Sequence, residues 1–140
     1  MDWTECGRNK LVKQVRVDDN FAASLRASSA NKLESQDLLP LNDTTAASKI
    51  SLAYDAVREL LEAVAIERGF KVYNHECYCA FLREILKESA LADSFDSFRK
   101  ARNAVNYYGR NVSIAEAGFI LTEMRSFISR VGERFPGKPP

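Results

Sequence analysis

The chain has 140 residues, the usual size of one compact domain. Hydrophobic residues make up 46% of it and charged residues 28%, so the composition excludes a disordered chain and a collagen-like one. Lysine and arginine number 20 against 19 aspartate and glutamate, and the net charge of +1 excludes a generally basic surface for non-specific nucleic-acid binding. A local basic patch remains compatible with this balance. The single histidine excludes a multi-histidine metal site within one chain.

The cysteines and the hydropathy pattern bear on the cellular compartment. Cysteines stand at positions 6, 77 and 79, and an odd number with two so close together argues against a disulfide framework and for a reducing cytosol. No stretch approaches the roughly 18 apolar residues of a membrane-spanning helix, and the charged start MDWTECGRNK lacks the apolar core of a signal peptide. We therefore expect a cytoplasmic protein that has no membrane partner.

The first helix with a clear start follows an N-terminal extension, residues 1–17, whose apolar positions fit a short helix and a strand equally well. Asp18 and Asp19 can cap this helix. It is expected to run to about Leu39, because Pro40 cannot continue it.

The second helix has the strongest periodicity. It follows Asn42 and Asp43 and ends at Gly69, a residue type that commonly terminates helices. Its apolar residues recur at spacings of three and four, which places them on one face of an α-helix. These predicted core residues are Ile50, Ala53, Val57, Leu60, Leu61, Val64 and Ala65.

Three further helices are expected. Asn74 can cap the third, the fourth begins near Asp93 and ends at Gly109, and Ser113 forms a capping box with Glu116 for the fifth. Their predicted core faces are Tyr78, Phe81, Leu82, Ile85 and Leu86 in the third, Phe98, Ala101, Val105 and Tyr108 in the fourth, and Ile114, Ala117, Leu121, Met124, Ile128 and Val131 in the fifth.

These elements predict an all-α fold, a five-helix up-and-down antiparallel bundle over residues 18–135. No segment alternates with period two for long enough to indicate a sheet. The tail PGKPP, residues 136–140, cannot continue the last helix and is expected to fray.

Polar side chains gather on one side of the fourth helix, on the face opposite Phe98, Ala101 and Val105. Arginine forks bind phosphate oxygens bidentately, and amides can read base edges or ribose hydroxyls. The alternative is a solvated face whose arginines pair with carboxylates such as Asp93 and Asp96. The residues of this face are Arg99, Arg102, Asn103, Asn106 and Arg110.

The run FRKARNAVNYYG resembles the signature helix of the HEPN domain, a five-helix fold associated with nucleotides and RNA. In the catalytic branch of that family the motif is an arginine, a polar residue, three more residues and a histidine. Arg102 and Asn103 match the first two positions, and Tyr107 stands where the histidine would be. The run SLAYDAVRELLEAVAIERGFKVYNHE resembles the family's second helix, so the resemblance covers about residues 18–135.

The resemblance implies a homodimer that binds RNA or a nucleotide without a metal or cofactor, beside a nucleotidyltransferase or in a toxin–antitoxin or defence pair. Whether the protein is an enzyme stays open, because a phenol with a pKa near ~10 shuttles protons poorly at neutral pH and RNase activity is therefore disfavoured. Two alternatives remain: Tyr107 as the acceptor of a nucleotidyl group, and a catalytically silent module that docks a protein. The resemblance implies Arg102, Asn103 and Tyr107 as catalytic residues. The polar face of the fourth helix predicts a phosphate-binding set of Arg99, Arg102, Asn106 and Arg110.

The only histidine, His75, begins the pattern H-x-C-x-C with Cys77 and Cys79. A metal site is disfavoured, because helical positions two apart point in different directions and cannot converge on one ion. We expect His75 to lie in the first turn after Asn74, and one of the two cysteines to pack as a small apolar side chain. Tyr54, in the second helix, is expected in the core or at a dimer interface.

Overall fold

The computed structural model describes residues 1–107 and 111–138. This part of the chain is mostly helical, so the all-α prediction is confirmed, and it also contains one small two-stranded sheet and a π-helical turn. The elements are α1 (Trp3–Arg8), β1 (Val12–Gln14), α2 (Asp19–Asp37), α3 (Ala46–Glu67), β2 (Phe70–Val72), α4 (His75–Ala80), the π-helical turn (Phe81–Ile85), α5 (Ser89–Tyr107) and α6 (Ile114–Arg134).

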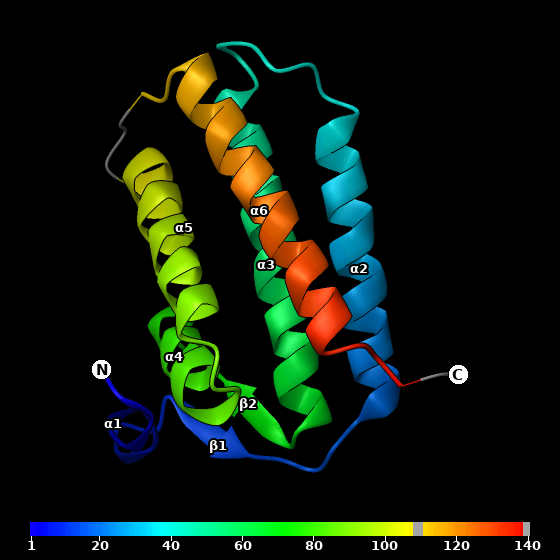
Figure 1. Ribbon diagram of the computed structural model, residues 1–140, viewed down its shortest axis with the longest axis vertical. Helices are drawn as coiled ribbons and strands as arrows, with labels where there is room; N and C mark the ends of the chain where they lie inside the picture. Colours follow the sequence, from blue (N-terminus) through cyan, green and yellow to red (C-terminus); the bar gives the residue numbers. More distant parts are fainter. Residues whose placement is uncertain (108–110, 139–140) are drawn as a thin grey trace.

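Four long helices, α2, α3, α5 and α6, lie side by side and alternate in direction (Figure 1). The central one is α3, which packs against each of the other three. The predicted third helix is divided into two parts, since its first six residues form α4 and the next five form the π-helical turn. This short element lies against α5 at one end of the long helices (Figure 1). Four long helices, together with the shorter α4 and its π-helical turn, therefore form the body of the described chain.

The helix α3 is buried nearly all round. Every residue of its predicted apolar stripe is buried, and so are residues outside that stripe, such as Tyr54 and Ile66. This burial follows from its position, because a helix with neighbours on several sides has no fully solvated face. The helix is followed by Gly69 with a φ of +82°, where a Cβ would lie 3.2 Å from the carbonyl oxygen of Val15. Glycine is thus required for the chain to turn into β2.

The predicted helix starts are set by the residues expected to cap them. The side chains of Asp18, Asn74 and Ser113 each accept a bond from a backbone N–H of the following first turn, at 2.9, 2.8 and 3.0 Å. The helix α5 begins at Ser89 rather than near Asp93, because the apolar residues just before Asp93 also pack into the core.

Residues 1–17 form α1 and β1 and pack against the core. Strand β1 pairs antiparallel with β2, with Val12 opposite Val72. The expectation of no sheet is wrong here, since strands of three residues are too short to show alternation in the sequence. The indole of Trp3 meets the ring of Phe70 edge-on, with centroids 5.3 Å apart.

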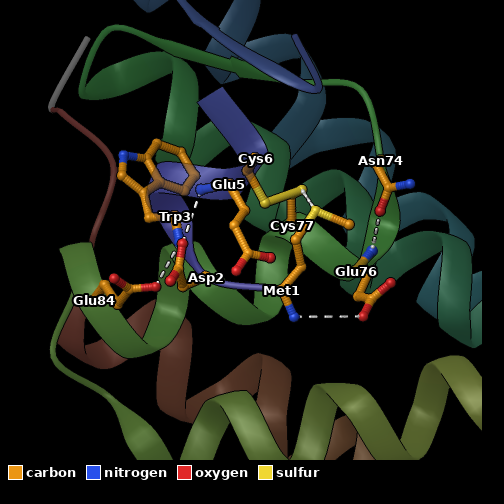
Figure 2. The surroundings of a disulfide bond; sticks show 9 residues. All are labelled: Met1, Asp2, Trp3, Glu5, Cys6, Asn74, Glu76, Cys77 and Glu84. Atoms are coloured by element: carbon orange, nitrogen blue, oxygen red, sulfur yellow. Dashed lines mark hydrogen bonds and ion pairs between the residues drawn. A yellow bond between two sulfur atoms is a disulfide. The ribbon is translucent and has the colours of Figure 1, made fainter. Parts of the chain in front are cut away.

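A disulfide joins Cys6 of α1 to Cys77 of α4, as Figure 2 shows. The prediction against a disulfide is therefore wrong, and the free, buried cysteine is Cys79. Beside the disulfide, the backbone N–H of Trp3 donates to the carboxylate of Glu84 at 2.6 Å (Figure 2). The N-terminal segment is thus tied to α4 and to the π-helical turn by a covalent bond and a hydrogen bond.

The buried face of α6 differs from the predicted one at two positions. Phe127, absent from the predicted stripe, is fully buried. Ile114, predicted to face inward, is 44% exposed at the first residue of the helix. The periodic pattern therefore begins about one turn before the part of α6 that reaches the core, where Ala117 is buried.

Three sequence expectations concern residues near the gaps in the described chain. Tyr108 and Gly109, the expected end of the fourth helix, lie outside the described residues, as do 139–140 of the tail. Lys138 lies in the described part of the tail, with its Nζ 3.3 Å from a carboxylate oxygen of Asp19.

Within the described ranges, no helix is both long enough and apolar enough to cross a membrane.

Candidate functional site

The polar face of α5 lies at the boundary between α3, α4 and solvent. The guanidinium of Arg102 lies over the ring of Tyr54 from α3, with its Cζ 5.1 Å from the ring centroid. Arg99, one helical turn earlier, is also mostly covered, with 21% of its side chain exposed. Oδ1 of Asn103 lies 3.5 Å from a terminal nitrogen of Arg102. The structure thus brings three predicted residues together, and it does not place them on a fully solvated surface.

Tyr54 links this face to the start of α4. The residue is fully buried, and its hydroxyl lies 2.8 Å from Nδ1 of His75. Its ring stacks on Phe95 of α5, with centroids 5.8 Å apart. The phenol therefore contacts the imidazole at its hydroxyl and the Arg102 guanidinium at its ring. We call Tyr54, His75, Arg99 and Arg102 the arginine site.

A single carboxylate, Asp96, anchors part of this face. It accepts bonds from Arg99 and Lys100, each at 2.9 Å, and its Oδ1 lies 3.8 Å from the thiol of Cys79. Burial opposes its ionisation, but the bonds from Lys100 and Arg99 outweigh burial and hold the pKa of Asp96 below its usual value. Burial, with the charge of Asp96, raises the pKa of Cys79 to about 11, so the thiol stays protonated and is a poor nucleophile.

The other predicted residues are spread further along α5. Oδ1 of Asn106 accepts a bond from the hydroxyl of Ser51 at 3.0 Å, which ties the exposed end of α5 to α3. Tyr107 is the last residue of α5, and its side chain lies outside what the structure describes. Arg110 lies outside the described residues altogether. The predicted roles of Tyr107 and Arg110 therefore stay predictions.

Burial sets the protonation states of the Tyr54–His75 pair. Burial first, and then the positive charges of Arg58 and Arg102, lower the pKa of His75 from its ordinary value of 6.5. Burial raises the pKa of Tyr54 above its ordinary value, against the opposing effect of Arg102. At neutral pH the imidazole is therefore uncharged and the phenol protonated. The positive charge of the site comes from its two arginines.

Sequence reasoning did not assign His75 or Tyr54 to the site. The spacing of Tyr54 marks it as a core residue, and His75 was expected only to occupy a helix start. Their meeting depends on how α4 crosses α3, and no local pattern encodes that crossing. A weak signal was present, because the only imidazole of the chain stands next to the capping residue Asn74, where a helix emerges at the surface.

The chemistry available at the site is that of guanidinium and imidazole groups. Throughout residues 1–107 and 111–138, no group of three or more His, Cys, Asp and Glu side chains is placed to hold a metal ion. Cys77 of the H-x-C-x-C pattern is in the disulfide and offers no thiolate. Such donors suit an anion whose oxygens accept several hydrogen bonds.

Comparison of the chain with family models, curated proteins and solved structures finds no match.

Proposed function

We propose that the arginine site binds the phosphate groups of RNA or of a nucleotide. The observation that carries the proposal is the placement of Arg102, whose guanidinium stacks on the buried ring of Tyr54 one helical turn from Arg99. Stacking uses the flat face of a guanidinium, while its N–H donors point outward from its edge. Arg99, one turn earlier, carries a second guanidinium, one of whose terminal nitrogens bonds Asp96. Two guanidiniums at this spacing suit the oxygens of a phosphate.

The local charge also favours an anion. Between positions 96 and 102, the three cations Arg99, Lys100 and Arg102 face one carboxylate, Asp96. This basic patch lies on a chain whose net charge is only +1. The HEPN resemblance of the same helix supports RNA as the ligand class. Because Tyr107 stands at the position of the family's histidine, we propose binding rather than cleavage as the activity of the motif.

Replacing Arg102 is expected to weaken binding of a short single-stranded RNA at low salt by about tenfold or more, because charge-assisted bonds contribute about 1.5–3 kcal/mol each. Arg102→Lys is also expected to bind worse than wild type, since an ammonium cannot reproduce the bidentate fork. Fluorescence anisotropy of a labelled RNA gives these affinities, and their salt dependence follows a slope near ~0.7 per phosphate contacted.

The matched control is Arg125→Gln, compared with Arg102→Gln. Arg125 lies on α6, is half exposed and is ion-paired to Asp37 of α2, so its replacement removes the same charge from another face. An equal loss of affinity in the two variants would show that RNA binding depends only on the net charge of the protein. Unchanged affinity in Arg102→Gln would remove the arginine site as the binding surface.

By the same resemblance, we propose that the protein is a homodimer that works with a nucleotidyltransferase or in a toxin–antitoxin or defence pair. We keep the cytoplasm, indicated by the hydropathy pattern, as its proposed location. Light scattering is expected to give about twice the chain mass of 15.7 kDa, and a mass of one chain at micromolar concentration would contradict the dimer. A neighbouring reading frame that encodes a nucleotidyltransferase would support the proposed partner.

The second candidate is a catalytically silent module that docks an acidic protein surface. The observation that favours it is Asp96, whose carboxylate already engages Arg99 and Lys100. A partner's carboxylates would bind the same donors in the same way. An absence of RNA and nucleotide binding at low salt would favour this candidate over the first.

A further inference from the structure

We propose that His75 is the third anion contact of the arginine site, and that its protonation strengthens phosphate binding there. The inference rests on the proposed function and adds to it a residue and a pH dependence. It starts from the position of the imidazole, which the hydroxyl of Tyr54 holds at 2.8 Å while the ring of the same tyrosine carries Arg102. One buried side chain thus positions both an imidazole and a guanidinium.

The hydrogen bond to Tyr54 occupies Nδ1 of His75, so a phosphate would be bound through Nε2. In the neutral tautomer that carries its proton on Nε2, Nδ1 accepts the hydrogen bond of the Tyr54 phenol. The Nε2–H group is a donor that a phosphate oxygen can accept. When the ring is protonated, Nδ1–H donates to the phenol oxygen instead, so the bond to Tyr54 survives the change of charge.

The half-buried setting makes the charge of His75 responsive to a ligand. The charges that act most strongly on the imidazole are those of Arg58 and Asp55 on α3 and of Arg99 and Arg102 on α5, three cations and one carboxylate. With burial, these cations keep the pKa of His75 below its ordinary value. A bound phosphate brings negative charge among them and favours the imidazolium, so the pKa rises on binding.

The thermodynamic linkage between protonation of His75 and phosphate binding determines whether RNA affinity rises or falls with pH. Protonation and phosphate binding favour each other by the same factor, so affinity rises as the pH falls through the pKa of His75. A rise of about one pKa unit on binding corresponds to about tenfold tighter binding below the pKa of the free protein than well above it. Neither a phosphodiester nor an arginine titrates between about pH 5 and 8, so neither supplies this dependence.

The single histidine makes the test direct, because the imidazole signals in an NMR spectrum of the chain belong to His75 alone. The probe is a short oligouridylate with unphosphorylated ends, which has no group that titrates in this range. We expect its addition to raise the pKa of His75 by about one unit, and anisotropy to give a correspondingly higher affinity in acid. The wild-type titration needs no variant to fold.

Two variants distinguish a direct contact of His75 with RNA from the positioning role of Tyr54. His75→Gln is expected to weaken RNA binding and to remove its pH dependence, while the salt dependence that the arginines supply remains. Tyr54→Phe keeps the ring under Arg102 and removes only the hydroxyl, so it is expected to reduce the RNA-induced pKa shift of His75 while binding persists. Tyr54 is in this sense a positioning residue.

The outcomes distinguish this inference from the proposed function. RNA binding that depends on Arg102, together with a His75 pKa that RNA does not change, would overturn the role of His75 alone. A wild-type pH profile in His75→Gln would overturn that role as well. If wild-type protein binds no RNA at low salt at any pH, the proposed function fails and this inference fails with it.

Discussion

Removal of the Cys6–Cys77 disulfide is expected to lower the free energy of unfolding by about 2–5 kcal/mol. The two cysteines are 71 positions apart and both are fully buried, so the cross-link restricts a long stretch of the unfolded chain. It also holds α1 in place, where Trp3 packs against Phe70 and Phe81. Loss of the bond removes the covalent anchor of this aromatic contact.

Urea unfolding of the double variant Cys6→Ala/Cys77→Ala, followed by circular dichroism, measures this loss without leaving a reactive thiol. The control is Cys79→Ala, which removes the buried cysteine outside the disulfide. Wild-type protein treated with a dithiol reductant is expected to unfold at a urea concentration close to that of the double variant. Identical midpoints with and without the reductant would contradict a stabilising disulfide.

The same bond bears on the proposed cytoplasmic location. Disulfides are rare in the reducing cytosol of mesophiles but occur in intracellular proteins of hyperthermophiles. Alkylation of thiols in acid-quenched cells, followed by mass spectrometry, reports the state of Cys6 and Cys77. If the protein is cytoplasmic and the disulfide persists there, both cysteines escape alkylation while Cys79 is labelled after denaturation.

Replacing Phe127 with alanine is expected to cost about 3–5 kcal/mol of unfolding free energy. Phe127 is fully buried, and its ring meets Phe98 of α5 edge-on with centroids 5.6 Å apart. Truncation leaves a cavity between α5 and α6 in addition to the lost transfer free energy. The matched control is Phe119→Ala on the same helix, where the ring is 68% exposed and the expected change is below about 0.5 kcal/mol.

Equilibrium denaturation of dilute protein gives both values on one scale. Equal losses of unfolding free energy in Phe127→Ala and Phe119→Ala would mean that α6 does not pack through the face that carries Phe127. A cost for Phe127→Ala as small as that of a surface change would contradict the assigned core.

Elements governed by local chemistry were predictable. The stripe of α3 is buried as its spacing indicates, and Asp18, Asn74 and Ser113 cap the helices that they precede. Each of these depends on residues within one or two turns of one another, so the sequence carries the full signal. The stop at Gly69 is of the same kind, since its positive φ is a local requirement.

Features that depend on contacts distant in the chain were missed. The sheet needs β1 to meet β2, and the disulfide needs α1 to lie on α4, although neither short segment has a pattern of its own. Phe127 lies between Met124 and Ile128 of the predicted stripe, and the core of α6 is wide enough to include all three positions. The arginines were found because they share one helix, whereas His75 and Tyr54 reach them from two others.

Side-chain NMR would show whether Arg99 and Arg102 hold the phosphates of a bound RNA. The Nε–H signals of the arginines are followed in labelled protein while unlabelled single-stranded RNA is added at low salt. We expect large, saturable shifts for Arg99 and Arg102 and little change for Arg125, which lies on α6 in its pair with Asp37. Shifts at Arg125 with none at Arg99 and Arg102, or no shifts at all, would contradict it.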